Sequence, residues 1–277
     1  MAQIKLAAAD LDGTLLRDDK TVSPFTLETI ERVLDSGVQF VVASGRTRGI
    51  IPPPLLDNPR IRYLLTCNGG VIWDKQENRA IEEKLLPYDD ALAILRKGKE
   101  FNCIREASID GMMYISECDV EDEIELIFPK MRGRMYTLRT PVPDVEDLVV
   151  QKHMDPEKLL FFFHHTEDRE PLRRWIEENF DLEITSSHPL GLEINTRGVN
   201  KGEALEKIAD MLGIARENVF AAGDSENDGD MIAFAGTGVA MGNAEDCVLQ
   251  LTDLVTDDNE HDGAAQAMVR WILEEEP

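Results

Sequence analysis

Three short segments of the chain are apolar at nearly every position, rather than at every second position. They lie in residues 4–9, 38–43 and 218–223 and read IKLAAA, VQFVVA and NVFAAG. A strand with one exposed face alternates apolar and polar residues, so continuous runs indicate strands that are covered on both faces, as in a parallel sheet. This pattern restricts the chain to folds in which helices cover both faces of a sheet.

Helix signals stand between these runs. Ser23 followed by Pro24 is typical of a helix N-terminus, and Gly37 is typical of the end of that helix. A second helix is predicted over residues 201–212, with Gly213 after its last turn. The other predicted elements are a strand over residues 62–70, a hairpin over 71–83 and a helix over 263–273. Strand and helix alternate at the intervals of a doubly wound α/β domain.

The middle of the chain has a different pattern. Its predicted helices and strands lie in residues 88–98, 103–116, 158–165, 169–180 and 182–187. Two of these strands meet at Asp110-Gly111, a good hairpin turn. The pattern predicts an α+β unit, residues 85–187, inserted into an α/β core made of residues 1–84 and 188–277.

Composition limits the classes of partner. The chain has 277 residues and a net charge of −25, which argues against nucleic acid or an anionic membrane surface, because both require basic patches. No apolar run approaches the length of a membrane span, and the N-terminal sequence lacks the features of a signal peptide. Four scattered cysteines without a CxxC pair favour a reducing cytoplasm over zinc or a disulfide framework. The sequence carries no signal for an oligomeric state.

Each apolar run ends in residues that can take part in chemistry. Asp10 and Asp12 stand at the end of the first run, Ser44 follows the second, and Asp224 follows the third with Asp228 close behind. Ligands of open α/β sheets bind beyond the carboxyl ends of the strands, so we expect these residues to gather at one edge. Clustered carboxylates repel one another unless a cation lies among them, and oxygen ligands without nearby His or Cys indicate Mg²⁺.

Four segments, in this order, resemble the motifs of the haloacid dehalogenase-like hydrolases. They are DLDGTL (10–15), ASGR (43–46), NKGEAL (200–205) and GDSEND (223–228). Two more, TCNGG (66–70) and TDDNEHDG (256–263), together with the placement of the insert, are similar to the Cof-like subfamily with a type IIB cap. The resemblance spans nearly the whole chain, and it implies a Rossmann-like parallel-sheet core with an inserted α+β cap.

The resemblance also implies a role for each matching residue. Asp10 matches the nucleophile that forms an aspartyl-phosphate, and Asp12 matches the general acid and base. Ser44 matches the residue that hydrogen-bonds the phosphoryl oxygens, and Lys201 matches the cation that stabilises their charge. The residues expected to contact phosphate or substrate are Asp10, Gly13, Ser44, Gly45, Arg46, Lys201 and Asn227. Those expected at the Mg²⁺ site are Asp10, Asp12 through its main-chain carbonyl, Asp224, and Asp228 in a supporting shell with Asn227.

The second acid of the first motif narrows the expected reaction. Within this superfamily, ion-pumping ATPases carry threonine in place of Asp12 and dehalogenases lack the acid, so its presence favours a phosphatase or a phosphomutase. We therefore expect Mg²⁺-dependent hydrolysis of a small phosphorylated metabolite, with sugar phosphates as the class that the resemblance implies. A phosphomutase that acts on a sugar phosphate is the alternative. A non-catalytic binding module is a second alternative, which the intact motifs disfavour.

Two further features receive no catalytic role. His164 and His165 are adjacent in a predicted strand, so their side chains point to opposite faces and cannot bind one metal ion. Residues 131–139 form a basic segment in an acidic chain, either as a solvated face or as part of a cap surface that meets an anionic substrate.

Overall fold

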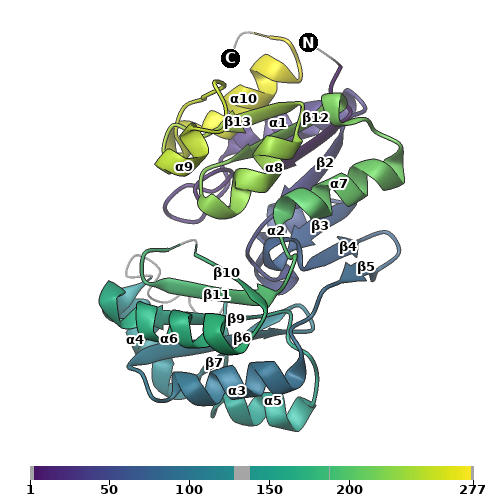
Figure 1. The fold of residues 1–277 in the computed structure, drawn as a ribbon. Helices are drawn as coiled ribbons and strands as arrows, with labels where there is room; N and C mark the ends of the chain where they lie inside the picture. The colour runs from purple at the N-terminus through teal and green to yellow at the C-terminus, as the bar shows by residue number, and fades with distance from the viewer. Residues whose placement is uncertain (1–2, 128–137, 187, 276–277) are drawn as a thin grey trace. The chain divides into compact units, whose positions relative to one another are not determined.

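The computed structural model describes residues 3–127, 138–186 and 188–275. The chain forms two compact units, which we name the core unit and the inserted unit. The core unit comprises Met1–Gly45, Ile51–Glu82 and Asn200–Pro277, and the inserted unit comprises Arg46–Ile50 and Glu83–Val199. Figure 1 shows the elements of each unit as a ribbon coloured along the chain.

A seven-stranded sheet forms the centre of the core unit, in the order β13-β12-β1-β2-β3-β4-β5 (Figure 1). The strands are β1 (Leu6–Ala9), β2 (Gln39–Ala43), β3 (Tyr63–Thr66), β4 (Val71–Asp74), β5 (Arg79–Glu83), β12 (Val219–Gly223) and β13 (Thr237–Ala240). The pairs from β13 to β3 are parallel, and β4 returns antiparallel to β3. Strands are added on opposite sides of β1, which makes its carboxyl end the switch point where ligands of such sheets bind.

Helices cover both faces of this sheet because its central strands are apolar on both faces. Along β1, Ala7 belongs to the hydrophobic core on one face and Ala8 to the core on the other. The helices are α1 (Pro24–Asp35) and α10 (Gly263–Trp271) on the first face, and α7 (Lys201–Leu212) and α8 (Gly229–Phe234) on the second. Two short helices, α2 (Pro53–Leu56) and α9 (Asp246–Leu249), lie in the connections. The predicted α/β core with a parallel sheet is confirmed.

The inserted unit has its own six-stranded sheet, in the order β10-β11-β9-β6-β7-β8. The strands are β6 (Cys103–Ile109), β7 (Met112–Ser116), β8 (Thr140–Val142), β9 (Lys158–Phe163), β10 (Leu182–Thr185) and β11 (Gly191–Thr196). The helices are α3 (Tyr88–Gly98), α5 (Val145–Lys152) and α6 (Thr166–Asn179), which share one apolar core with the sheet, and α4 (Val120–Leu126), which adjoins the opposite face. Asp110 and Gly111 form the predicted turn between β6 and β7, with φ values of 53° and 75°.

The chain returns to the core unit later than the sequence pattern predicts. The sequence places the return at residue 188, whereas the core unit resumes at Asn200. The difference arises because β11 pairs with β9 and β10, so this strand completes the sheet of the inserted unit. The periodicity of a strand reveals its exposed and buried faces but not the sheet that it joins.

Three further sequence predictions concern a helix of the inserted unit, the basic segment and membrane spans. The helix predicted over residues 169–180 exists, but it begins earlier, at Thr166. Of the basic segment, residues 131–137 lie outside the described residues, so its role stays a prediction. Among the helices that the structure describes, none has both the length and the apolar composition needed to cross a membrane.

Gly69 and Gly37 offer a matched test of close packing in the core unit. Both have positive φ, 90° and 87°, where other residues are strained. A Cβ at Gly69 would lie 2.4 Å from the backbone oxygen of Asn200, whereas a Cβ at Gly37 would meet nothing within 4 Å. The two positions therefore share the conformational cost and differ in the steric cost.

We expect Gly37→Ala to lower the free energy of unfolding by about 1 kcal/mol, the cost of a left-handed conformation. Gly69→Ala should lower it by about 3 kcal/mol, because backbone must also move to admit the methyl group. Urea denaturation of both variants measures the difference. Equal losses would contradict the packing of Gly69 against Asn200.

Candidate functional site

The register of the parallel strands brings three of the predicted site residues to one edge of the core sheet. Ala9, the last residue of β1, lies opposite Val42 of β2 and Ala222 of β12. The residues that follow at the ends of these strands are Asp10, Ser44 and Asp224. All three are buried. The predicted gathering of strand-end residues at the sheet edge therefore agrees with the register.

Gly13 turns the chain sharply after Asp10. Its φ is 83°, which glycine adopts without strain, and a Cβ here would lie 2.3 Å from Oδ2 of Asp224. The next residue, Thr14, donates a hydrogen bond from its hydroxyl to Oδ1 of Asp224 at 3.0 Å. The turn thus connects the end of β1 to the end of β12, and only glycine allows so close an approach.

Lys201 joins two carboxylates across the site. It is the first residue of α7, after the N-cap Asn200, and it is fully buried. Its ammonium donates to Oδ1 of Asp10 at 2.7 Å and to Oδ1 of Asp228 at 2.6 Å. Burial lowers the pKa of Lys201, but the two carboxylates outweigh burial and raise the pKa above its ordinary value. Lys201 therefore carries its charge at neutral pH.

Asp228 uses its second oxygen to organise the loop after β12. Oδ2 accepts hydrogen bonds from the backbone N–H groups of Asp224, at 2.9 Å, and Ser225, at 3.0 Å. The hydroxyl of Ser225 donates in turn to Oδ2 of Asp224 at 3.1 Å. A Cβ at Gly223 would lie 2.4 Å from the Cβ of Asp228, so this approach also depends on glycine. Asp228 thus positions both Asp224 and Lys201.

Asp10, Asp224 and Asp228 form a group of buried carboxylates with one oxygen of each within 4.8 Å of the others. Burial, with help from the neighbouring acids and against the effect of Lys201, raises the pKa of Asp10 well above its ordinary value. Burial and the adjacent charge of Asp228 raise the pKa of Asp224 to about 7. Three acids beside one ammonium lack positive charge, and an all-oxygen donor set is the kind that Mg²⁺ prefers. The residues present therefore fit a divalent cation.

The side chain of Asp12 lies outside this group of buried carboxylates. It is 37% exposed, and Oδ1 pairs with the ammonium of Lys20 at 2.8 Å. A backbone bridge between Asp12 and Leu16 holds the intervening loop. Lys20 belongs to none of the motifs, and sequence reasoning missed it. Its only signal was a cation eight residues after Asp12 in the same loop.

Backbone hydrogen bonds hold Ser44 at the end of β2. Its N–H donates to the carbonyl of Leu65 at 2.8 Å, and its carbonyl accepts from the N–H of Asn68 at 3.0 Å. Asn68 has a left-handed φ of 61°, and its side-chain oxygen accepts from Nδ2 of Asn227 at 2.9 Å. Asn68 therefore links Ser44 to the loop that carries Asn227. The sequence pattern assigned no role to Asn68.

Gly45 and Arg46 stand where the chain passes from one unit to the other. Ser44 and Gly45 belong to the core unit, and Arg46 is the first residue of the inserted unit. Nη1 of Arg46 donates to the carbonyl of Ile50 at 3.0 Å. Contact of Gly45 and Arg46 with a substrate stays a prediction.

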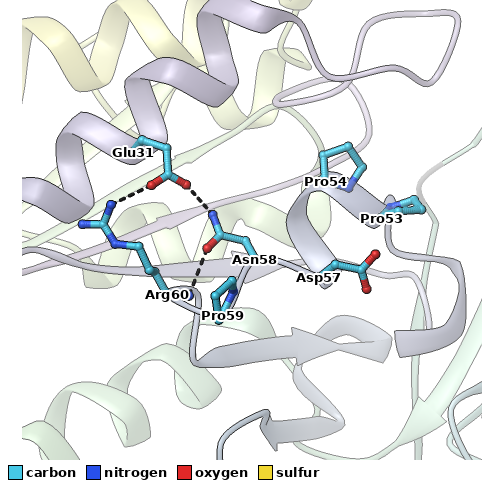
Figure 2. Close-up of a pocket in the computed structure, with 7 residues that line it drawn as sticks. All are labelled: Glu31, Pro53, Pro54, Asp57, Asn58, Pro59 and Arg60. Atoms are coloured by element: carbon cyan, nitrogen blue, oxygen red, sulfur yellow. Dashed lines mark hydrogen bonds and ion pairs between the residues drawn. The ribbon is translucent and has the colours of Figure 1, made fainter.

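A separate pocket of the core unit holds none of the predicted site residues. Figure 2 shows three of its polar residues paired with one another: Glu31 accepts from Asn58 and from Arg60, each at 2.6 Å. Prolines form much of the remaining lining. These internal pairs account for Glu31 and Arg60, and Asp57 also lines the pocket.

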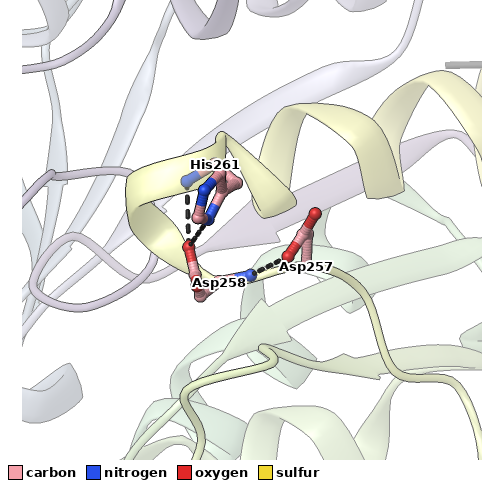
Figure 3. A group of neighbouring side chains, drawn as sticks. All are labelled: Asp257, Asp258 and His261. Atoms are coloured by element: carbon pink, nitrogen blue, oxygen red, sulfur yellow. Dashed lines mark hydrogen bonds and ion pairs between the residues drawn. The ribbon is translucent and has the colours of Figure 1, made fainter.

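A second acidic group lies before α10 (Figure 3). Oδ1 of Asp258 accepts the backbone N–H of His261 at 2.9 Å and lies 2.6 Å from Nδ1 of that ring. Oδ1 of Asp257 accepts the backbone N–H of Asp258 at 3.0 Å. Asp258 therefore serves as the N-cap of a short helical turn, and local hydrogen bonds explain the cluster.

Comparisons with known proteins agree with the motifs. The family model of the haloacid dehalogenase-like hydrolases matches residues 7–268. The chain is 35% identical over 273 residues to a 5-amino-6-(5-phospho-D-ribitylamino)uracil phosphatase of Bacillus subtilis, covering 98% of this chain and 96% of that one. It is 30% identical to a pyridoxal phosphate phosphatase of Escherichia coli, covering 97% and 99%. A solved haloacid dehalogenase-like hydrolase from B. subtilis has a TM-score of 0.85 at 27% identity, covering 97% and 100%.

The charge of Lys201 should matter more for stability than that of an exposed lysine on the same helix. Lys201→Met leaves Asp10 and Asp228 buried without their ammonium, so we expect the free energy of unfolding at pH 8, without metal, to fall by about 3 kcal/mol. The control is Lys207→Met, which removes a half-exposed ion pair with Glu82 and should cost less than about 1 kcal/mol. Urea denaturation compares the two, and similar losses would contradict the bridging role of Lys201.

Proposed function

Since this chain belongs to the haloacid dehalogenase-like hydrolases and is a phosphatase of that family, we propose that it hydrolyses small phosphomonoesters in a Mg²⁺-dependent reaction. In this proposal Asp10 is the nucleophile and carries the phosphoryl group between two steps. The proposed substrates are sugar phosphates and related small phosphorylated metabolites.

The observation that carries this proposal is the Lys201 ammonium held between Asp10 and Asp228. The ammonium fixes the orientation of a carboxylate at the switch point of the sheet and places positive charge beside it. A phosphoryl group that approaches Asp10 would find a nucleophile and a charge-stabilising cation in one place. The arrangement suits phosphoryl transfer to a carboxylate better than simple binding of an anion, because three acidic side chains would repel an anion.

In the first step, an oxygen of Asp10 attacks phosphorus, and the bond between phosphorus and the ester oxygen breaks. Asp12 donates its proton to that oxygen, which leaves as an alcohol. The Asp12 side chain is 37% exposed, which leaves it open to proton exchange with substrate and solvent. The enzyme is left with an acyl phosphate on Asp10.

In the second step, water attacks phosphorus and the bond to Asp10 breaks. The now ionised Asp12 accepts a proton from that water, and inorganic phosphate leaves. Ser44 and Lys201 stabilise the negative charge on the phosphoryl oxygens in both steps. One water is consumed for each alcohol and phosphate released, and both acids return to their starting forms.

The residues that would hold Mg²⁺ are Asp10, Asp224 and the main-chain carbonyl of Asp12, with Asp228 as the adjacent acid that orients Asp224. When bound, Mg²⁺ supplies positive charge that reduces the repulsion between the Asp10 carboxylate and a phosphate dianion. The raised pKa values of Asp10 and Asp224 are consistent with this assignment: burial is the main cause, neighbouring acids add to it, and a cation bound there would favour the ionised form of both carboxyl groups.

The curated relatives support the substrate class without selecting a member of it. Their names specify a ribitylamino-uracil phosphate and pyridoxal phosphate, both small phosphorylated metabolites. We propose the cytoplasm as the location, on the four scattered cysteines, none of which forms a disulfide.

The test of the proposed function is a phosphate-release assay of the purified protein with Mg²⁺. The panel contains hexose and pentose phosphates, a ribitylamino-uracil phosphate and pyridoxal phosphate, ranked by kcat/KM. Release of stoichiometric inorganic phosphate supports the phosphatase. If a sugar phosphate is isomerised and no phosphate is released, the protein is a phosphomutase and the phosphatase proposal is wrong. If no ester is turned over, the proposed function is refuted.

We expect Asp10→Asn to lower kcat by more than about 10³-fold, because the amide cannot form the acyl phosphate. The fold should persist, since the amide occupies the same volume. Asp210→Asn, which changes an exposed acid on α7, is the control and should keep the activity of the unaltered protein. Residual activity of Asp10→Asn above a tenth of that control would exclude Asp10 as nucleophile.

Removing the metal should abolish turnover, and adding it should stabilise the fold. We expect 10 mM Mg²⁺ to raise the Tm of the EDTA-treated protein by about 3 °C or more, since a ligand that binds only the folded state stabilises it. Asp224→Asn should lose this shift and Asp210→Asn should keep it. Full activity in EDTA, or an unchanged Mg²⁺ shift in Asp224→Asn, would contradict the metal site.

A further inference from the structure

The segment directly after Ser44 belongs to the inserted unit, although it lies within the first fifty residues of the chain. Arg46–Ile50 groups with Glu83–Val199, whereas Ser44 and Gly45 group with the core unit. One residue, Gly45, therefore separates Ser44 from a segment that is held by the other unit.

Two groups of this segment bind one carbonyl in the β6–β7 turn. The Oγ1 hydroxyl of Thr47 and the N–H of Gly49 both donate to the carbonyl oxygen of Gly111, the latter at 2.7 Å. Gly111 donates its own N–H to Oε1 of Glu157 at 2.8 Å. Thr47 is fully buried, and Gly111 and Glu157 are also buried. We name Thr47, Gly49 and Gly111 the tether.

Close packing reinforces these hydrogen bonds. A Cβ at Gly49 would lie 2.7 Å from the carbonyl oxygen of Gly111, so this position must remain glycine for the two backbones to approach. Gly111 itself has a φ of 75°. Arg46 closes the segment by its hydrogen bond to the carbonyl of Ile50. The segment is thus fixed to the β6–β7 turn by side chain and backbone together.

Ser44 itself is hydrogen-bonded to residues of the core unit. Its N–H binds the carbonyl of Leu65, and its carbonyl binds the N–H of Asn68. The backbone of Ser44 is therefore hydrogen-bonded within the core unit, and Gly45 joins it along the chain to Arg46, the first residue of the inserted unit. Gly45 and Arg46 form the covalent path between the tether and Ser44.

We propose that Thr47 is a positioning residue for Ser44: its hydroxyl, bound to Gly111, sets the backbone that aims Ser44 at the phosphoryl group. The inference rests on the proposed function, because it assigns Ser44 a role in phosphoryl transfer. Thr47 itself contacts no reacting atom in this scheme.

The kinetic test compares Thr47→Val with Thr47→Ser. Valine keeps the shape of the side chain and loses the donor, so we expect kcat to fall about 10- to 100-fold, the range for a misplaced reacting group, with KM changed less than about twofold. Serine keeps the donor and should restore kcat to within about threefold of the unaltered protein. A loss that serine does not restore would overturn the role of the hydroxyl.

A double-mutant cycle tests whether Thr47 acts through Ser44. In the Ser44→Ala background, Thr47→Val should lower kcat by less than about twofold, because the group that it positions is gone. An equal loss in both backgrounds would overturn the proposal. If Thr47→Val does not fold, Gly49→Ala replaces it in the same cycle, since the new methyl group pushes the segment away from Gly111 without removing a hydroxyl.

Amide hydrogen exchange separates failure of this inference from failure of the proposed function. In Thr47→Val, peptides covering residues 44–50 should exchange at least about tenfold faster than in the unaltered protein, while a peptide from β12 stays unchanged. Thr47→Ser should match the unaltered protein. If no phosphomonoester is hydrolysed but exchange follows this pattern, the proposed function fails and the tether stands. Unchanged exchange in Thr47→Val refutes the tether, whatever the activity.

Discussion

The site depends on the pairing of the Lys201 ammonium with the carboxylates of Asp10 and Asp228. Asp10 and Asp228 are buried beside it, and buried carboxylates without a cation would be protonated or would destabilise the fold. The first residue of a helix is an unfavourable place for a cation, because the helix dipole is positive there. The helix dipole of α7 disfavours a cation at this position, so the attraction of the two carboxylates is what stabilises Lys201 there. The ammonium donates to Asp10 and Asp228, whereas burial and the charge of Asp228 raise the pKa of Asp224, and a divalent cation fits beside that carboxyl group.

Close approach of backbone to carboxylate builds the rest of the site. Gly13 admits Asp224, and Gly223 admits Asp228, at distances that no other residue would allow. Asp228 then accepts two backbone N–H groups from the loop that carries Asp224. These contacts fix the positions of the residues that follow β1 and β12. Ser44, which follows β2, is the site residue from the third strand. In the inserted unit, Thr47 and Gly49 likewise bind a backbone carbonyl, that of Gly111.

Several of these features could be predicted from single residues and their spacing. The apolar strands ending in Asp10, Ser44 and Asp224 predicted both the parallel sheet and the edge where the residues meet, because the ends of parallel strands coincide. Other partners carried no such signal. Lys20 is an ordinary lysine in a loop, and Asn68, although it lies in the TCNGG segment, carries no sign of its partner; each gains its partner only when the chain folds. The membership of β11 in the second sheet was missed for the same reason, since strand pairing is not encoded in the strand's own pattern.

The sequence by itself determined the fold class and the family motifs, and it predicted an inserted unit and the site residues, because periodicity and motif spacing are local properties of the chain. The tertiary structure alone decided which oxygens share Lys201, how Asp12 comes to face Lys20 and why the segment after Ser44 belongs with a turn more than sixty residues away. Those facts depend on contacts between distant segments, and the energy of a buried charge or hydroxyl is set by what packs around it rather than by its neighbours in sequence.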